Sequence, residues 1–195
     1  MEPVTILAIS SSPRRGGNTD RLLSEAMKAS LSFGARVETA NLCDYDMQPC
    51  IECGQCEGVG QCVIQDDFQR LYKSFMAVDR VILASPVFFM TVSSQAKVLI
   101  DRCQCFWERK YRMKLRIPAR GGIPRRGYLI SCAGSGLPDV FDCSRKVVDF
   151  FYRTLDMEFA GDVALNGVND VGDAEKHPES LKAAFELGMK AASPE

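Results

Sequence analysis

The chain has very little of several residue types, and each shortage excludes a class of function. Its 195 residues include one histidine, His177, and one tryptophan. His177 precedes Pro178 in a polar stretch, so it is interpreted as a solvated surface residue. A single histidine leaves almost no material for histidine-based catalysis or for the two-histidine zinc motif of metalloproteases.

The sequence also lacks a charge excess of either sign and a long apolar run. The formal net charge is −1, which gives no basic field for binding nucleic acid or a membrane surface. No apolar run approaches the roughly 20 residues of a membrane span. Met1-Glu2-Pro3 has neither the basic start nor the apolar core of a signal peptide. We therefore expect a cytoplasmic protein with no nucleic-acid or membrane partner.

Apolar segments alternate with amphipathic ones along the chain, whose length suits one domain over residues 1–195. Strands are predicted over 4–9, 36–42, 80–85 and 128–132, and a weaker one over 157–165. Amphipathic helices are predicted over about 20–31, 66–76, 94–107, 140–155 and 173–192. This alternation indicates an α/β fold, a doubly wound parallel sheet of five strands with helices on both faces.

The loop after the first predicted strand has the composition of a phosphate site. Residues 10–19 combine serines and glycines with Arg14, Asn18 and Thr19. Free backbone N–H groups, hydroxyl donors and about half a unit of helix dipole charge converge on one anion in such a loop. The pattern is neither a dinucleotide fingerprint nor an ATP-type P-loop, and it suits a terminal monophosphate. An ordinary turn with a helix cap has the same composition, so this loop alone leaves both interpretations open.

Two further loops follow strand ends at the edge where doubly wound sheets bind ligands. Residues 85–92 form an apolar and aromatic run that could line the face of a flat ring, although each residue alone is more typical of a core. Residues 132–136 are small and would let backbone N–H groups approach a ring edge. A phosphate site beside an apolar slot favours a mononucleotide such as FMN.

Four of the nine cysteines lie within thirteen residues, in the pattern Cys50-x2-Cys53-x2-Cys56-x5-Cys62. The cytosol keeps thiols reduced, so this run indicates metal or redox chemistry rather than disulfides. One loop, about 43–65, can bring all four to a single [4Fe-4S] cluster, because no second run exists to hold another. Structural zinc and thiols without a ligand remain alternatives. The others are interpreted as buried small hydrophobes: Cys43, Cys103, Cys105, Cys132 and Cys143.

Three charged segments are interpreted as structural. Residues 109–126 carry many basic side chains and no acidic one, which favours a solvated face, with a site for an acidic or phosphate-bearing partner as the alternative. Asp66-Asp67 is interpreted as a helix cap rather than an acid–base pair. Asp101-Arg102 is interpreted as a surface or interface ion pair.

Several of these segments resemble signatures of a known family. Residues 11–19 are similar to the phosphate loop of the NADPH-dependent FMN reductases, although that family usually has Gly where Ser11 stands. Residues 85–89, with Lys97 and Asp101-Arg102 further along, are similar to the family's second signature. Within the family, the cysteine run followed by two aspartates resembles the iron–sulfur flavoproteins. The resemblance is good over residues 4–136.

The resemblance implies a flavodoxin-like fold with strand order 2-1-3-4-5 and the cysteine loop as an insertion. It implies no catalytic side chain, because the flavin carries the chemistry, and Cys50, Cys53, Cys56 and Cys62 as cluster ligands. FMN would be held by residues of all three loops: Ser10, Ser12, Arg14, Asn18 and Thr19 at the phosphate, Pro86, Val87, Phe88, Phe89 and Met90 along the isoalloxazine, and Ala133 and Gly134 at its pyrimidine edge.

The function implied is that of an oxidoreductase with FMN and a cluster. It would take electrons from a one-electron donor such as a ferredoxin-like protein and pass them to quinone, oxygen or peroxide. The cluster of related flavoproteins lies near the FMN of a partner subunit, which implies a homodimer or homotetramer. Two alternatives remain: an NAD(P)H-dependent FMN or quinone reductase without a cluster, and a non-enzymatic redox or metal sensor.

Overall fold

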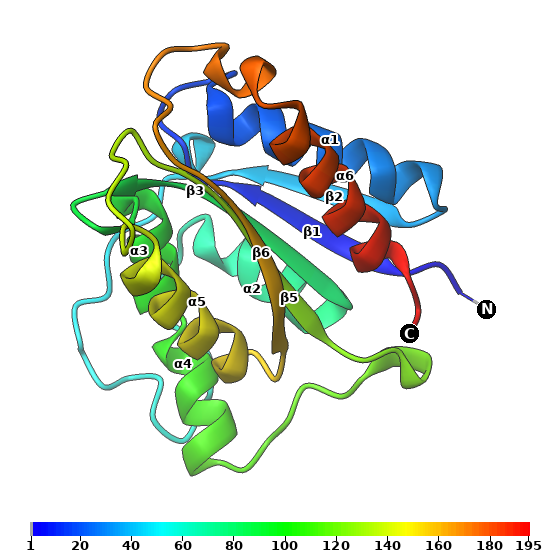
Figure 1. The fold of residues 1–195 in the computed structure, drawn as a ribbon. Coiled ribbons are helices and arrows are strands. Elements are labelled where there is room, and N and C mark those ends of the chain that lie inside the picture. The colour runs from blue at the N-terminus through cyan, green and yellow to red at the C-terminus, as the bar shows by residue number, and fades with distance from the viewer. Residues whose placement is uncertain (1) are drawn as a thin grey trace.

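A computed structural model describes residues 2–195, in which strands and helices alternate (Figure 1). The strands are β1 (Thr5–Ser10), β2 (Arg36–Asn41), β3 (Arg80–Phe88), β4 (Thr91–Val92), β5 (Arg126–Cys132) and β6 (Glu158–Leu165). The helices are α1 (Asn18–Ser32), α2 (Phe68–Ala77), α3 (Ser94–Arg102), α4 (Gln104–Trp107), α5 (Asp142–Thr154) and α6 (Pro178–Ala192). No helix in this part of the chain has both the length and the apolar character needed to cross a membrane.

Five of the strands form a parallel sheet in the order β2-β1-β3-β5-β6. The predicted fourth and fifth strands are β5 and β6, so the doubly wound sheet and its 2-1-3-4-5 order are confirmed. The sequence did not predict β4, which pairs antiparallel with the end of β3. Strand β3 therefore runs past residue 85 to Phe88, and a two-residue turn links it to β4.

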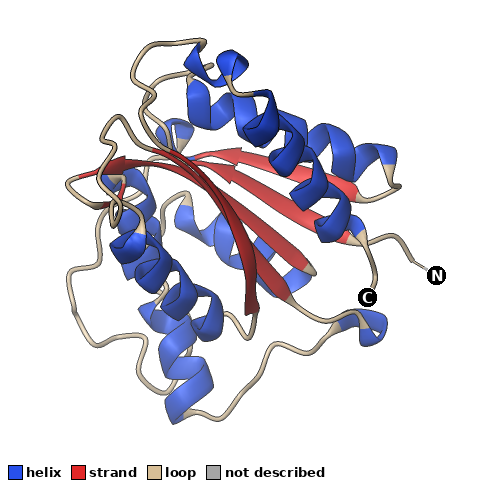
Figure 2. Ribbon diagram, viewed as in Figure 1, coloured by secondary structure: helices blue, strands red, loops and turns tan. Residues whose placement is uncertain are grey.

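Helices cover both faces of the sheet, as predicted (Figure 2). Successive strand residues point to opposite faces. Ile6 packs in the core shared with α1 and α6, whereas Leu7 packs in the core shared with α2, α3 and α5. Helices α1 and α6 approach each other very closely, since a Cβ at Gly188 of α6 would meet the carbonyl oxygen of Ala26 in α1 at 2.1 Å.

The predicted helix over 94–107 is interrupted. Helix α3 ends at Arg102, α4 follows as a single turn, and residues Glu108–Arg112 form a π-helical turn. Ser93 caps α3, since its Oγ accepts from the N–H of Ala96 at 3.3 Å. The broken helix directs residues of both pieces toward the cysteine loop.

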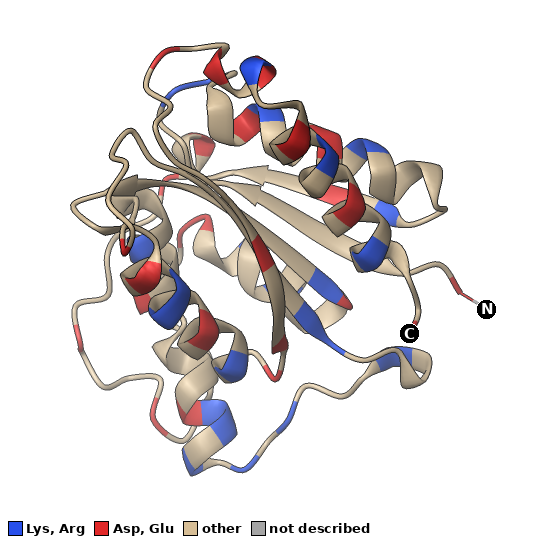
Figure 3. Ribbon diagram, viewed as in Figure 1, with Lys and Arg blue, Asp and Glu red and all other residues tan. Residues whose placement is uncertain are grey.

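Figure 3 marks the Lys and Arg positions of the basic segment 109–126, which is only in part the solvated face that was predicted. Arg125 is buried, and its guanidinium donates to the carbonyl oxygens of Phe75 and Val78 at the end of α2. Arg120 forms an ion pair with the buried Asp79. Acids and carbonyls distant in sequence therefore fix much of this segment to the sheet, and only part of it faces solvent.

Candidate functional site

The loops at the carboxyl ends of β1, β3 and β5 line one cavity of about 350 Å³. Most of the residues predicted to bind FMN border it: Ser12, Arg14, Asn18, Thr19, Pro86, Val87, Phe88 and Gly134. The others lie outside its lining: Ser10, Phe89, Met90 and Ala133. The cavity therefore brings together both ends of the predicted mononucleotide site.

Asp20, in the first turn of α1, holds the loop over residues 10–19 in its conformation by accepting two hydrogen bonds from it. The Ser10 hydroxyl donates to Asp20 Oδ1 at 2.5 Å, and the N–H of Gly16 donates to Asp20 Oδ2 at 2.9 Å. Gly16 has a φ of 65°, a conformation that favours glycine. Ser10 is thus placed to brace the loop rather than to contact a ligand in the cavity.

Helix α1 begins without a side-chain cap, because Gly17 occupies its N-cap position. A Cβ there would lie 3.1 Å from the carbonyl oxygen of Arg14. The N–H groups of the first turn have no acceptor within a helix and carry the positive end of the helix dipole. This helix start, together with Arg14 and Ser12 on the cavity wall, provides the donors that a phosphate needs.

Ser11 fastens this loop to its neighbour. The N–H and Oγ of Ser11 donate to the carbonyl oxygen of Ala84 at 2.9 and 3.0 Å. The hydroxyl of Ser93 donates to the carbonyl oxygen of Ser11 at 2.9 Å. The serine that replaces the family's usual glycine therefore adds one hydrogen bond between the ends of β1 and β3.

The apolar wall of the cavity is carried by the β3–β4 hairpin. Its two-residue turn, Phe89-Met90, has φ values of 49° and 66°. Such turns normally contain Asn or Gly, because positive φ costs about 1–2 kcal/mol for other residues. Phe89 is fully exposed, and Met90 packs beside Val140 and Phe141. Strain of this kind is typical of functional sites.

The sequence missed a fourth loop, which follows β6. Val168 and Asn169 line the cavity. Arg14 Nη1 donates to the carbonyl oxygen of Asn169 at 2.6 Å, and Asn18 Nδ2 donates to that of Asp170 at 3.0 Å. The available signal was the polar stretch that follows the fifth predicted strand, at the same edge of the sheet as the other three loops.

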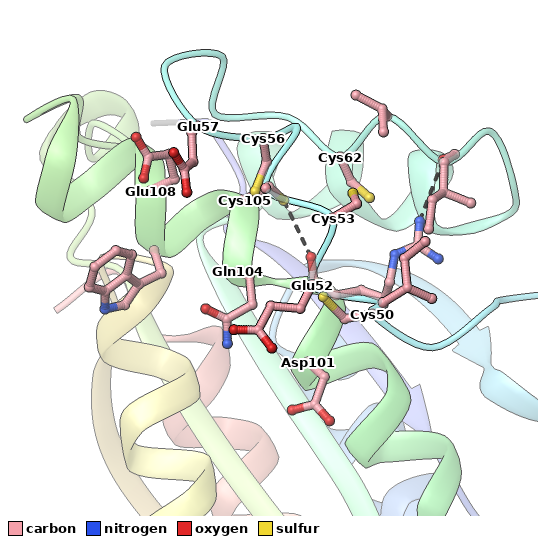
Figure 4. Close-up of a pocket in the computed structure, with 16 residues that line it drawn as sticks. Cys50, Glu52, Cys53, Cys56, Glu57, Cys62, Asp101, Gln104, Cys105 and Glu108 are labelled. Atoms are coloured by element: carbon pink, nitrogen blue, oxygen red, sulfur yellow. Dashed lines mark hydrogen bonds between the residues drawn. The ribbon is translucent and has the colours of Figure 1, made fainter.

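A second cavity, of about 510 Å³, lies under the cysteine loop. Cys50, Cys53, Cys56 and Cys62 all line it, together with Cys105 of α4 (Figure 4). These five cysteines are free thiols. The structure thus places all four predicted cluster ligands around one space.

The cysteine loop is held through its backbone. Gln69 Nε2 donates to the carbonyl oxygens of Cys62 and Ile64, at 2.8 Å in each case. The hydroxyl of Tyr72 donates to the carbonyl oxygen of Gly60 at 2.9 Å. Because α2 holds carbonyl groups rather than sulfur atoms, the four thiols stay available to a ligand.

The four cysteine side chains border one space without converging on a single point. Within residues 2–195, no group of three or more His, Cys, Asp or Glu side chains converges closely enough to hold a single ion. Each thiolate of a cubane binds a different iron atom, so the ligands of a cluster stand further apart than those of zinc. Here, four free thiols border one cavity.

The other cysteines divide into two groups. Cys103, Cys105 and Cys132 are buried, as predicted, whereas Cys43 and Cys143 are exposed, so the prediction of buried small residues was wrong for these two. Burial, with a further contribution from nearby cysteines, raises the pKa of Cys105 to about 12, which keeps its thiol protonated near neutral pH.

The predicted Asp101-Arg102 surface pair is also wrong. Asp101 pairs with Lys97 at 2.8 Å, one helical turn away. Arg102 is buried and pairs with Asp66 at 2.5 Å. Asp66 Oδ1 also accepts from the N–H of Phe68, the first residue of α2, at 3.1 Å, whereas Asp67 occupies the N-cap position and makes no side-chain cap hydrogen bond. Burial acts to raise the pKa of Asp66, but hydrogen bonds from Arg102 and from the backbone outweigh it and lower that pKa.

Comparison with known proteins gives one matching family and several relatives of this chain. A model of the NADPH-dependent FMN reductase family matches residues 4–128. An iron-sulfur flavoprotein of Methanocaldococcus jannaschii is 42% identical over 97 residues, half of this chain and half of that protein. One of Archaeoglobus fulgidus is 31% identical over 95% of this chain and 78% of its own length.

Solved structures agree on the fold. The chain resembles an NAD(P)H:quinone oxidoreductase from Methanothermobacter marburgensis with a TM-score of 0.71, at 14% identity and 98% coverage of both chains. A likeness at this identity concerns the fold alone.

Proposed function

Because the chain belongs to the NADPH-dependent FMN reductase family, we propose that it is a flavin oxidoreductase that binds FMN and a [4Fe-4S] cluster. The observation that carries the proposal is the pair of cavities: one bordered by a helix start and an apolar hairpin, the other by four free cysteines. In this proposal it transfers electrons between a one-electron donor, such as a ferredoxin-like protein, and quinone, oxygen or peroxide.

In the first cavity, the start of α1, with Arg14 and Ser12, would hold the FMN phosphate. Pro86, Val87 and Phe88 would line the isoalloxazine ring. FMN supplies two-electron chemistry, and the residues around it supply position and electrostatics. No side chain of this chain need act as an acid or a base.

In the second cavity, Cys50, Cys53, Cys56 and Cys62 would hold the cluster, which supplies one-electron chemistry. Their loop follows β2, the neighbour of β1 in the sheet. The cysteine loop and the phosphate loop therefore lie at the same edge of the sheet, where two redox groups would be neighbours.

A homodimer or homotetramer is part of the proposal. Phe89 is fully exposed at the tip of a strained turn beside the FMN cavity, and Phe88 is about half exposed. Aromatic side chains at such a position favour cover by another subunit or by a flat ligand.

A second candidate is an NAD(P)H-dependent FMN or quinone reductase in which the cysteines carry no cluster. The family to which the chain belongs favours it. Hydride transfer from a nicotinamide to FMN would then need only the first cavity.

Anaerobic quinone reduction separates the two candidates. We would compare chemically reduced methyl viologen, a one-electron donor, with NADPH in wild type and in a Cys53→Ser/Cys56→Ser variant of equal FMN content. Cys143→Ser, an exposed cysteine outside both cavities, is the control. We expect the viologen-driven rate to fall at least about tenfold, roughly 1.4 kcal/mol in the barrier, in the double variant alone. Rapid NADPH oxidation that the double substitution leaves unchanged would favour the reductase without a cluster.

A further inference from the structure

Arg102, the last residue of α3, is the charged side chain that joins the two ends of the cysteine loop. It is 1% exposed. Its Nη1 donates to the carbonyl oxygen of Gln48 at 2.7 Å, and its Nη2 lies 3.4 Å from that of Ile64. These carbonyls stand two residues before Cys50 and two residues after Cys62. One guanidinium therefore spans the entrance and the exit of the loop that carries the thiols.

The guanidinium is held in a fixed orientation. Nη1 and Nη2 also donate to the two carboxylate oxygens of Asp66, at 2.5 and 3.0 Å. The cation packs over the ring of Phe68, at 4.7 Å from the ring centroid. A bidentate pair of this kind fixes the plane of an arginine more firmly than it would a lysine.

One N–H donor of Arg102 has no acceptor among the described residues. Arg102 Nε is buried and has no hydrogen-bond partner in the described part of the chain. A buried N–H without a partner has lost its hydrogen bonds to water and gained none in return, so an acceptor bound beside it would stabilise the site. Arg102 and Cys62 line the same cavity, which is the space that the proposed cluster would fill.

We propose that Arg102 is a positioning residue of the cluster site: it fastens both ends of the cysteine loop and presents its cation and its Nε donor to the sulfur atoms of the bound cluster. This inference rests on the proposed function, because it requires a cluster. One-electron reduction, with the electron supplied by the donor, adds one negative charge to the cluster and its four thiolates. A fixed cation beside them stabilises the reduced state more than the oxidised state, and so raises the reduction potential.

Substitutions at the two members of the Arg102–Asp66 pair should shift the reduction potential of the cluster in opposite directions. Arg102→Gln removes the cation, so the cluster potential should fall by an amount equivalent to about a tenfold change in the reduction equilibrium, about 59 mV for one electron. Asp66→Asn removes the counter-charge and leaves the cation uncompensated, so the potential should rise. General loosening of the loop would shift both variants in the same direction.

The potentials would be measured by anaerobic redox titration of the holoprotein, with the cluster followed by EPR and the FMN of the same sample as internal reference. Arg70→Gln is the matched control, because it makes the same charge change on an exposed face of α2. A cluster potential in Arg102→Gln that equals the wild-type value, or equal shifts in the two pair variants, would overturn the inference. Iron-free wild type after reconstitution would instead overturn the proposed function on which it rests.

The fastening role has a readout that needs no cluster. In cluster-free protein, amide hydrogen exchange over residues 48–64 should be at least several-fold faster in Arg102→Gln than in wild type or Arg70→Gln. Arg102→Lys should also exchange faster, because one ammonium cannot replace the fork of donors, yet should keep most of the cluster potential. Exchange at the wild-type rate in both Arg102 variants would contradict the fastening role.

Discussion

At the scale of single residues, Gly134 lies close against Asn169 on the wall of the FMN cavity. A Cβ at Gly134 would lie 1.9 Å from Asn169 Oδ1, whereas a Cβ at Gly136 would meet nothing within 4 Å. Gly134→Ala must therefore displace Asn169 or the loop after β5. We expect FMN to bind about tenfold more weakly, about 1.4 kcal/mol, when titrated into apoprotein with flavin fluorescence as the signal.

Gly136→Ala is the matched control for that substitution, since it lies two residues along in the same loop and meets open space. It should bind FMN as wild type does. Equal affinities in wild type and both variants would show that the edge of the ring does not approach Gly134.

A second residue-scale prediction concerns acid stability. Asp79 is buried and accepts from the N–H and hydroxyl of Thr5 at 2.8 and 2.9 Å, and from Arg120 Nη2 at 2.6 Å. Burial acts to raise the pKa of Asp79, but these hydrogen bonds outweigh it and hold the pKa below its ordinary value. A depressed carboxyl pKa stabilises the fold fully above the unfolded value of about 3.9, and this stabilisation is lost as the pH falls through the folded pKa.

Asp79→Asn should therefore lower the free energy of unfolding by about 2–4 kcal/mol at pH 7. The gap from wild type should narrow as the pH falls below about 4. Urea unfolding at pH 7, 5 and 3 would measure it, with the more exposed Asp101→Asn as control. A gap that widens toward low pH would contradict the assigned sign.

The residue types in the sequence indicated the kind of site, but not which residues each side chain would contact in the fold. Arg14 was predicted at the cavity from its loop, whereas Asn169 was not, because its role depends on where the loop after β6 lies. Asp101 and Arg102 are adjacent in sequence, yet a helix directs them to different partners, Lys97 and Asp66. Pairing across tens of residues is a property of the fold, and no local pattern specifies it.

At the scale of elements, the end of α2 depends on a residue from the basic segment. Arg125 donates to the carbonyl oxygens of Phe75 and Val78, and its Nη2 lies 3.5 Å from that of Leu155, after α5. These carbonyls have no partner within a helix. Burial lowers the pKa of Arg125 to about 10, with Asp156 and Asp79 opposing the shift, so it stays charged at neutral pH.

Arg125→Met should lower the free energy of unfolding by about 2–4 kcal/mol, because it leaves buried helix-end carbonyls without donors. Arg112→Met, an exposed position in the same basic segment, should change it by less than about 0.5 kcal/mol. Chemical denaturation of the two variants would measure the difference. If both substitutions changed the free energy of unfolding by similarly small amounts, the whole segment would be better described as a solvated face.

Element boundaries were predicted well where periodicity was strong and poorly where it was absent. The alternation of apolar strands and amphipathic helices located the five parallel strands and the helices between them. The β3–β4 hairpin was missed because Phe89-Met90 contains none of the residues that normally mark a two-residue turn. The break at Cys103, between α3 and α4, carries no glycine or proline, so the sequence predicted one helix over 94–107, and the π-helical turn at Glu108–Arg112 lies beyond that prediction.

At the scale of the whole molecule, the arrangement of strands brings four loops and a cysteine insertion to one edge of the sheet. The residues themselves indicated a doubly wound sheet, whereas the order 2-1-3-4-5 came from the family resemblance, because no pattern within a strand names its neighbours. The proposed oligomer predicts a solution mass of two or four times the 21.6 kDa of the chain. Light scattering on a size-exclusion column would measure it, and a monomer at micromolar concentration would contradict that part of the proposal.

The most direct measurement is the content of iron, acid-labile sulfide and FMN in anaerobically purified protein, repeated after anaerobic reconstitution. We predict about four iron and four sulfide per FMN, with a broad absorption beside the flavin bands that dithionite bleaches. The same analysis of Cys53→Ser/Cys56→Ser should give FMN without stoichiometric iron. Wild-type protein that holds FMN but no iron, even after reconstitution, would contradict the account of an iron–sulfur flavoprotein.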